Sequence, residues 1–292
     1  MPWEASLRII GANASVSTGD AQFEQGRDPL AIDRVLPVAR EVLAQASVEA
    51  RSLDLILSMS ISPDRVALGK NVAGPRVCHP LQRELGAERA FVFDLYDDDW
   101  SAAIDIARGF CHEMDYKHVL LVRVECGGKS LAKDPESGFR VPDGAGCLLL
   151  RWDGAKSGRE PFGAWSHTNV APVQVDAFPW AECASGELRG QFRFPLQHGV
   201  SEKLNQAAIS LLRNALADQK ADHVVIESWF PGDVDARSVK DAIGLDPAID
   251  TRLGPFGLPY FAETLRGDGT RRLLSLTLNP FQMRYGYQWL QA

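Results

Sequence analysis

The residues best suited to chemistry stand together in one stretch, Phe93 to Ala103, which reads FDLYDDDWSAA. Three consecutive aspartates follow a short apolar run and precede the small residues of a predicted helix. Carboxylates in this place can cap the N–H groups of the first helical turn. Together with further carboxylates they could also bind a metal ion or act in general acid/base catalysis. Capping is the simplest of these roles, and we expect it for Asp97, Asp98 and Asp99.

The cysteines and histidines do not indicate a second centre. The five cysteines are scattered and include no C-x-x-C pair, so the sequence predicts neither a disulfide framework nor a zinc site. His79 and His198 lie at the starts of predicted helices, without a cysteine or acid at a convincing spacing. The run DGAG at 143–146 lacks the lysine of a phosphate-binding loop and indicates a turn that enters a strand. We therefore expect no metal and no cofactor.

Composition narrows the classes of partner. The chain has 292 residues, of which 45% are hydrophobic and 24% charged, as is usual for a globular protein. A net charge of −7 and the absence of a basic run argue against nucleic acid and anionic membranes as partners. No apolar run approaches the ~20 residues of a membrane span, and the first residues do not resemble a signal peptide. We expect a cytoplasmic protein.

Alternating patterns predict an α/β fold for the first half of the chain. Helical spacing of apolar residues is followed by compact apolar runs that are typical of buried strands. The predicted elements are a helix over Ala31–Val48, a strand within Leu53–Asp64, a strand over Arg89–Leu95, a helix over Asp99–Met114, and strands over His118–Glu125 and Gly144–Trp152. Such alternation favours a mainly parallel sheet covered by helices.

The same order returns later in the chain, which indicates a duplication. The segment EKLNQAAISLLRNALADQK followed by DHVVIESW repeats the order helix, loop, strand, and RRLLSLTLNP resembles KHVLLVRVE. Between the two halves lies a stretch rich in Gly, Pro, Trp and polar residues, which we interpret as a linker. The predicted organisation is an N-terminal half over 1–153, a linker over 154–189 and a C-terminal half over 190–292.

Four segments in order carry a family resemblance. LDLILSMSISPD, LQRELGAERAFVFDL, YKHVLLVRVE and DGAGCLLLRW occur as in the β-ketoacyl synthase III branch of the thiolase-fold superfamily. With SPD, CHPLQRELGAERA, VFDL, and ESGF followed by DGA, the chain especially resembles the PqsB-type subunit of heterodimeric 2-alkyl-4-quinolone synthases. The resemblance is clear over 53–152 and fainter over 200–292. It implies a thiolase-like fold with duplicated halves that form a five-layered α-β-α-β-α sandwich.

The resemblance also implies that three catalytic positions have changed. Active members place a cysteine at the N-terminus of a buried helix to accept an acyl group, and here that position is Asp99. The family histidine corresponds to Glu227, or to Ser228 if the alignment slips by one residue, and the family asparagine corresponds to Pro255. Neither a carboxylate nor a proline donates a hydrogen bond to an oxyanion. The segment that helps hold coenzyme A is largely replaced by SVSTGDAQFEQGRDP.

A partner follows from the same resemblance. The family dimerises edge to edge through the strand at Arg89–Leu95, and its loop at Pro63–Pro75 reaches toward the neighbour's acyl pocket. The expected interface residues are Arg89, Ala90, Phe91, Val92 and Phe93, with Val66 and Leu68 from the loop. The implied partner is a cysteine-bearing β-ketoacyl synthase III-like subunit that condenses a medium-chain acyl group with 2-aminobenzoylacetate to give an alkylquinolone. Whether heterodimers pair again into tetramers is left open.

Two other functions stay open at this stage. One is a stand-alone acyl-thioester hydrolase or decarboxylase that uses Asp99 and Glu227. The other is a homodimeric protein that holds an acyl or aromatic ligand in the old substrate tunnel. Trp100, directly after the nucleophile position, is a side chain large enough to fill such a tunnel.

Overall fold

The structure of the chain is a computed structural model. It describes residues 7–17, 30–60, 77–96, 98–126, 142–154, 165–167, 200–228, 234–265, 271–279 and 284–292. The predicted loop at Pro63–Pro75, with Val66 and Leu68, lies outside the described residues. So do Asp97, His198 and nearly all of the predicted linker.

The first half folds into a five-stranded sheet with helices on its faces. Its strands are β1 (Leu7–Val16), β2 (Leu55–Ser60), β3 (Phe91–Tyr96), β4 (His118–Glu125) and β5 (Gly144–Trp152), and its helices are α1 (Ala31–Gln45), η1 (Ala50–Ser52), α3 (Cys78–Leu85) and α4 (Trp100–Met114). The strand order is β3-β2-β4-β5-β1. Strand β5 runs antiparallel to β1 and β4, whereas β2 runs parallel to β3 and β4.

The second half repeats this topology. Its strands are β6 (Trp165–His167), β7 (His223–Ile226), β8 (Pro247–Ala248), β9 (Arg272–Asn279) and β10 (Arg284–Gln291), and its helices are α5 (Val200–Leu216), α6 (Ala236–Ile243), η3 (Gly254–Phe256) and α7 (Gly257–Thr264). The order is β8-β7-β9-β10-β6, with β10 antiparallel to its two neighbours within this half, β9 and β6. In each half the third strand is at one edge and the first at the other, so the predicted duplication is confirmed in the strand order.

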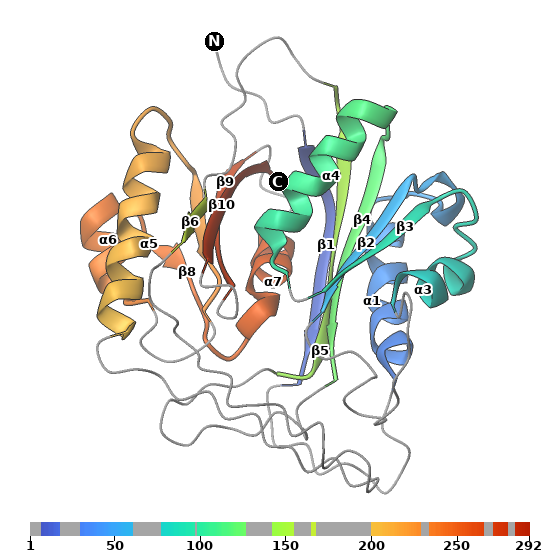
Figure 1. Cartoon of the computed structure of the whole chain (residues 1–292), viewed down its shortest axis with the longest axis horizontal. Coiled ribbons are helices and arrows are strands. Elements are labelled where there is room, and N and C mark those ends of the chain that lie inside the picture. Colours follow the sequence, from blue (N-terminus) through green and yellow to red (C-terminus); the bar gives the residue numbers. More distant parts are fainter. Residues whose placement is uncertain are drawn as a thin grey trace, which may run out of the picture.

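The elements form five layers (Figure 1). Helices α1 and α3 cover the outer face of the first sheet, and α5 and α6 cover the outer face of the second. Helix α4 lies between the sheets and packs against β2 and β4 on one side and β9 and β10 on the other. Helix α7 shares this central layer. The α-β-α-β-α sandwich expected from the sequence is therefore confirmed.

The sheets meet where Arg8 of β1 pairs with Gln291 of β10. The Arg8 guanidinium also donates to Oε1 of Gln291 over 3.3 Å. Pairing at this edge makes the two arrays one continuous sheet of described strands, which bends around the central helices.

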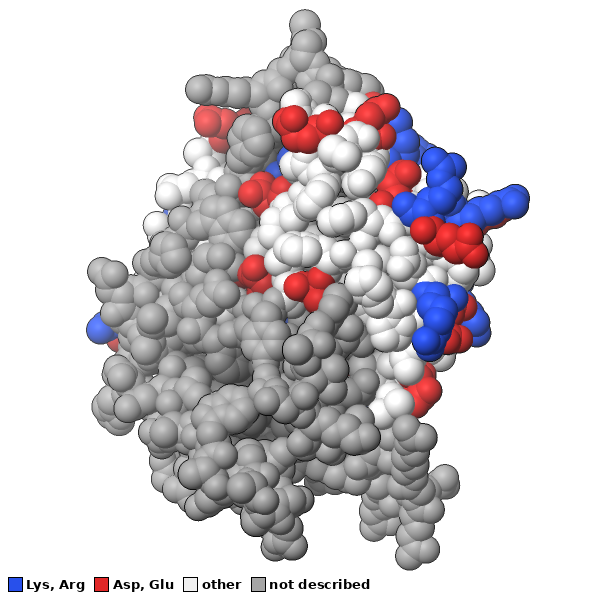
Figure 2. All heavy atoms as spheres, turned by 45° about the vertical axis from the view of Figure 1, so that its right-hand side comes forward, with Lys and Arg blue, Asp and Glu red and all other residues white. Residues whose placement is uncertain are grey.

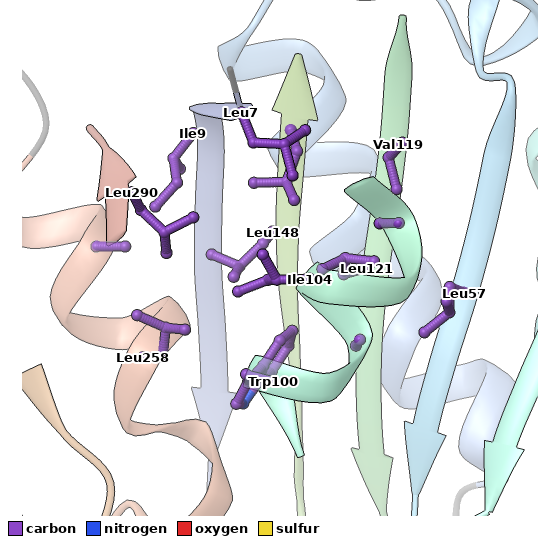
Figure 3. Close-up of a cluster of buried hydrophobic side chains, with 14 of the residues drawn as sticks. Leu7, Ile9, Leu57, Trp100, Ile104, Val119, Leu121, Leu148, Leu258 and Leu290 are labelled. Carbon is purple, nitrogen blue, oxygen red and sulfur yellow. The ribbon is translucent and has the colours of Figure 1, made fainter. Parts of the chain in front are cut away.

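Buried apolar side chains fill the central layer. A cluster drawn from β1, β2, β4, β5, α4, α7, β9 and β10 includes Trp100, Ile104, Leu148, Leu258 and Leu290, all fully buried. Figure 3 shows these side chains converging between α4, α7 and the strands. Burying large apolar side chains stabilises by about 1.5–3 kcal/mol each, so this cluster is a main source of cohesion between the halves.

Two glycines of β5 allow the central layer to close. A Cβ atom on Gly146 would lie 2.8 Å from Cγ of Pro259 and 3.2 Å from the ring of Phe256. A Cβ atom on Gly144 would lie 2.7 Å from the carbonyl oxygen of Ser15. The DGAG run thus enters a strand, as expected, and its glycines serve close packing.

Candidate functional site

Asp99 is the N-cap of α4. Its backbone is extended (φ −117°, ψ 167°), and its Oδ1 accepts a hydrogen bond of 3.0 Å from the amide of Ala102. The side chain of Asp98 accepts in turn from the Asp99 amide over 3.0 Å. The carboxylates at the start of α4 thus satisfy amide groups there, and the predicted capping role is confirmed for Asp98 and Asp99.

The second half also holds the Asp99 carboxylate. Thr277 of β9 donates to Oδ1 of Asp99 over 3.1 Å, and its hydroxyl lies 2.7 Å from the hydroxyl of Ser101. All three residues are at most 1% exposed. The network continues along α4, where Gln288 donates to the Ser101 carbonyl and accepts from Arg108. A buried polar seam therefore joins the helix of one half to the sheet of the other.

Glu227 directly follows β7 and is 1% exposed. Its amide donates to the carbonyl of Leu276 over 2.9 Å, which extends the pairing with β9. The first residue of α7, Gly257, is its neighbour, since a Cβ atom there would lie 3.9 Å from the Glu227 Cα atom. Ser228 is equally buried, so either residue of the predicted pair lies inside the molecule.

Pro255 lies in the short helix η3 and is buried. Its carbonyl accepts a hydrogen bond of 2.7 Å from Nε1 of Trp100, which follows Asp99 in the chain. Since η3 leads directly into α7 beside Glu227, this bond connects the segments of the three residues that the family resemblance predicts to be changed positions. The structure thus brings Asp99, Glu227 and Pro255 to one place in the central layer, from segments that are far apart in the sequence.

The described cysteines lie elsewhere. Cys78 is on α3, Cys111 near the end of α4, Cys126 after β4 and Cys147 within β5. Burial raises the pKa of the Cys111 thiol to about 12 and also raises the pKa of Cys147. None of these four thiols is at the first turn of α4, and a high pKa opposes the thiolate form that an acyl acceptor needs.

Comparisons with known proteins identify relatives of the chain. No protein-family model matches the chain. Over 272 residues it is 31% identical to the 2-heptyl-4(1H)-quinolone synthase subunit PqsB of Pseudomonas aeruginosa PAO1, which covers 91% of this chain and 87% of that protein. The chain belongs to the PqsB family.

More distant relatives are condensing enzymes. The chain is 23% identical over 267 residues to a β-ketoacyl-[acyl-carrier-protein] synthase III of Lactiplantibacillus plantarum, covering 85% of this chain and 76% of that one. The solved structure of 3-oxoacyl-(acyl carrier protein) synthase III from P. aeruginosa PAO1 superimposes with a TM-score of 0.71 at 15% identity, over 98% of both chains. This structural likeness shows the thiolase-like fold.

Sequence reasoning did not find the polar groups that support the site. Arg123 and Glu125 of β4 are both completely buried, and Nε of Arg123 lies 3.0 Å from Oε1 of Glu125. The same guanidinium donates over 3.0 Å to the Asp98 carbonyl, at the entrance to α4. The signal was present, because an arginine and a glutamate interrupt an otherwise apolar strand, HVLLVRVE. Thr277 gave no comparable signal.

The described residues form no group of three His, Cys, Asp or Glu side chains that could hold a metal ion. In the same part of the chain, no helix is both long and apolar enough to cross a membrane. The described surface does have an open groove of about 620 Å³ between α5 and α6, lined by Ser210, Arg213 and Asp241 among others. This groove is on the outer layer, whereas the three changed positions are in the central one.

Proposed function

We propose that this chain is the catalytically silent subunit of a heterodimeric condensing enzyme that makes 2-alkyl-4-quinolones, acting in the cytoplasm. The observation that carries the proposal is the buried helix cap formed by Asp99, the residue that the family resemblance aligns with the nucleophile. An acyl group on a carboxylate would be a mixed anhydride, which forms uphill and hydrolyses readily. Oδ1 of this carboxylate also accepts hydrogen bonds from Ala102 and Thr277, which bind it to the protein framework.

The pairing surface is the free edge of the first sheet. Strand β3 is at the end of the strand order, and it carries the exposed aromatic residues Phe91 (47%) and Phe93 (38%). Side chains two residues apart share one face of a strand. On that face Phe91 packs against Phe110 of α4, with ring centroids 5.5 Å apart. No described strand pairs with the outer edge of β3, and an open edge with exposed aromatic side chains is a liability that a partner would cover.

The surface around this edge suits a protein partner. Figure 2 brings the β3 side forward and shows a white, uncharged area on the described surface, with acidic side chains scattered on and around it and most of the visible lysines and arginines at one margin. Charge-depleted surfaces with exposed aromatic residues are typical of protein interfaces. Val66 and Leu68 stay predicted contributors, because they lie outside the described residues.

Not every residue of the predicted interface is equally accessible. Ala90 is 5% exposed, and its carbonyl accepts a hydrogen bond of 2.7 Å from the side chain of Gln82. A bulky residue at this position would disturb the core together with any interface. Phe91 and Phe93 are therefore better positions for testing the pairing.

The partner supplies the chemistry in this proposal. It carries the cysteine and histidine, accepts a medium-chain acyl group from a thioester, and condenses it with 2-aminobenzoylacetate. The present chain stabilises the partner and shapes its acyl pocket. Support comes from the family resemblance and from the PqsB relative, whose name describes a synthase subunit.

The test is native mass spectrometry of the protein purified from its own host through an affinity tag. We expect a one-to-one complex with a chain of similar size that contains a Phe-Asp-x-x-x-x-Cys segment. A homodimer or monomer without a companion would refute the subunit role. The purified chain would then be assayed alone for thioester hydrolysis, with Asp99→Asn as the variant that must abolish a hydrolase activity based on Asp99 and Glu227.

A further inference from the structure

The first side chain of α4 is the large indole of Trp100. Trp100 is 0% exposed and stands among the largest fully buried side chains of the described chain. It directly follows Asp99 and is linked through Pro255 to the segment beside Glu227. The indole thus lies at the start of α4, next to Asp99 in the chain and in contact with the carbonyl of Pro255.

The polar end of the indole is fixed. Nε1 of Trp100 donates a hydrogen bond of 2.7 Å to the carbonyl of Pro255, 155 residues later in the chain. A buried indole N–H normally finds such an acceptor, and here it sets the orientation of the ring. The bond also joins the first half, through α4, to the second half, through η3.

The apolar part of the indole is enclosed by residues of both halves. Ile104, Leu148 and Leu258 belong to the same buried cluster, and Figure 3 shows Trp100 at the first turn of α4, below Ile104 and across from Leu258. On the β5 side, Pro259 and Phe256 approach Gly146 so closely that a Cβ atom there would overlap Pro259. Protein cores pack to the density of organic crystals, so a space filled in this way has no room for an alkyl chain as well.

We infer that Trp100 seals an indole-sized compartment between the halves, so that this chain holds neither an acyl chain nor an aromatic ligand beside Asp99. The compartment is a latent binding site for a small planar aromatic molecule with one N–H donor. This inference rests on the packing of Trp100 and holds whether or not the chain pairs with a synthase subunit. If it holds, the chain cannot be the protein that binds an acyl or aromatic ligand in this place, which was one of the functions left open by the sequence.

The experiment removes the indole side chain of Trp100 and supplies indole as a free ligand. Trp100→Ala keeps the Cβ atom and removes the indole, leaving an apolar cavity of the kind that binds small aromatic molecules. We expect indole to raise the melting temperature of Trp100→Ala in a concentration-dependent way and to leave the wild-type chain unchanged. Benzofuran has the same shape but no N–H, and should bind roughly tenfold more weakly because the Pro255 carbonyl stays unpaired. Trp100→Phe is the control, since its ring occupies part of the cavity and should weaken indole binding.

Two results would overturn the inference. One is a folded Trp100→Ala chain, by circular dichroism, that does not respond to indole. The other is a wild-type chain that octanoate or indole stabilises as much as the variant. If Trp100→Ala does not fold, the wild-type chain decides: its Trp100 indole N–H signal, assigned by its loss in Trp100→Phe, should exchange slowly with deuterium and keep its chemical shift in octanoate. Fast exchange or a shift would contradict a sealed compartment.

Discussion

The hydroxyl of Thr277 donates a hydrogen bond of 3.1 Å to the carboxylate of Asp99, a residue 178 positions earlier in the chain. The cap of the central helix in one half is thus completed by a strand of the other half. Asp99 is therefore part of the framework that holds the two halves together.

Replacing Asp99 should therefore affect stability and leave catalysis by the complex unchanged. Asp99→Ala removes the helix cap and leaves Thr277 without this acceptor, which should cost about 2–4 kcal/mol of unfolding free energy. Asp99→Asn keeps an acceptor oxygen and should cost less. Urea unfolding of the purified chain measures both. If Asp99→Ala instead lowered turnover of an intact complex by about a hundredfold, the residue would be catalytic and the silent role would be wrong.

Substitution on the outer edge of β3 should weaken association with the partner and leave the stability of the isolated chain unchanged. Phe93→Glu places a charge on the exposed face of β3, and burying that charge against a partner should weaken association by about a hundredfold or more while the isolated chain stays folded. Size-exclusion chromatography with the partner subunit measures the loss. Tyr260→Glu is a matched control, because Tyr260 of α7 is 40% exposed, close to the 38% of Phe93. Equal weakening by the two variants would argue against an interface at β3.

Replacement by alanine should destabilise the chain at Gly146 and stabilise it at Gly109. Gly146→Ala places a Cβ atom 2.8 Å from Pro259, and this overlap in the central layer should cost about 1–3 kcal/mol. Gly109 is an exposed residue within α4, and a Cβ atom there meets no atom within 4 Å. Gly109→Ala should stabilise the chain by about 0.5–1 kcal/mol, because alanine is the better helix former. Thermal unfolding compares the variants, and stabilisation by Gly146→Ala would contradict the close approach of α7 to β5.

Removing one member of the buried pair Arg123 and Glu125 should cost more unfolding free energy than replacing both members by leucine. Arg123→Leu leaves the Glu125 carboxylate without its arginine in the core and removes a donor to the Asp98 carbonyl, so we expect a loss of about 3–5 kcal/mol. The double variant Arg123→Leu/Glu125→Leu removes both charges and should recover part of that loss. A double-mutant cycle in urea measures the coupling. Additive effects of the two single variants would show that the pair is not energetically linked.

Buried thiols should resist alkylation at neutral and mildly basic pH. Burial raises the pKa of the Cys111 thiol to about 12, so at pH 8 only roughly one molecule in ten thousand carries the reactive thiolate. The pKa of Cys78 is raised by burial and also by the Asp94 carboxylate. Iodoacetamide at pH 8 should therefore leave Cys78, Cys111 and Cys147 unmodified in the folded chain and label them after denaturation. Peptide mass spectrometry gives the answer, and rapid labelling of native Cys111 would contradict its burial.

Local patterns determined most of the secondary structure in advance. The apolar runs HVLLVRVE and GAGCLLLRW became β4 and β5 with the predicted bounds, and the helix predicted over Ala31–Val48 spans Ala31–Gln45. These patterns succeed because buried strands and amphipathic helices are specified by residues close together in the chain. The capping role of Asp99 was predictable for the same reason, since a cap acts within its own helical turn.

Through its family resemblance the sequence also predicted that Asp99, Glu227 and Pro255 belong to one site, but it did not show how these residues are connected. The Trp100–Pro255 and Asp99–Thr277 hydrogen bonds join segments that carry no common local signal. The burial of the Arg123–Glu125 pair likewise depends on which layers cover β4. Each of these contacts forms only when the two halves close around α4, because packing between distant segments is a property of the folded molecule. The sequence alone thus determined most of the elements, the repeated halves and the cap at Asp99, whereas the tertiary structure decided how Asp99 is held and where the indole of Trp100 lies.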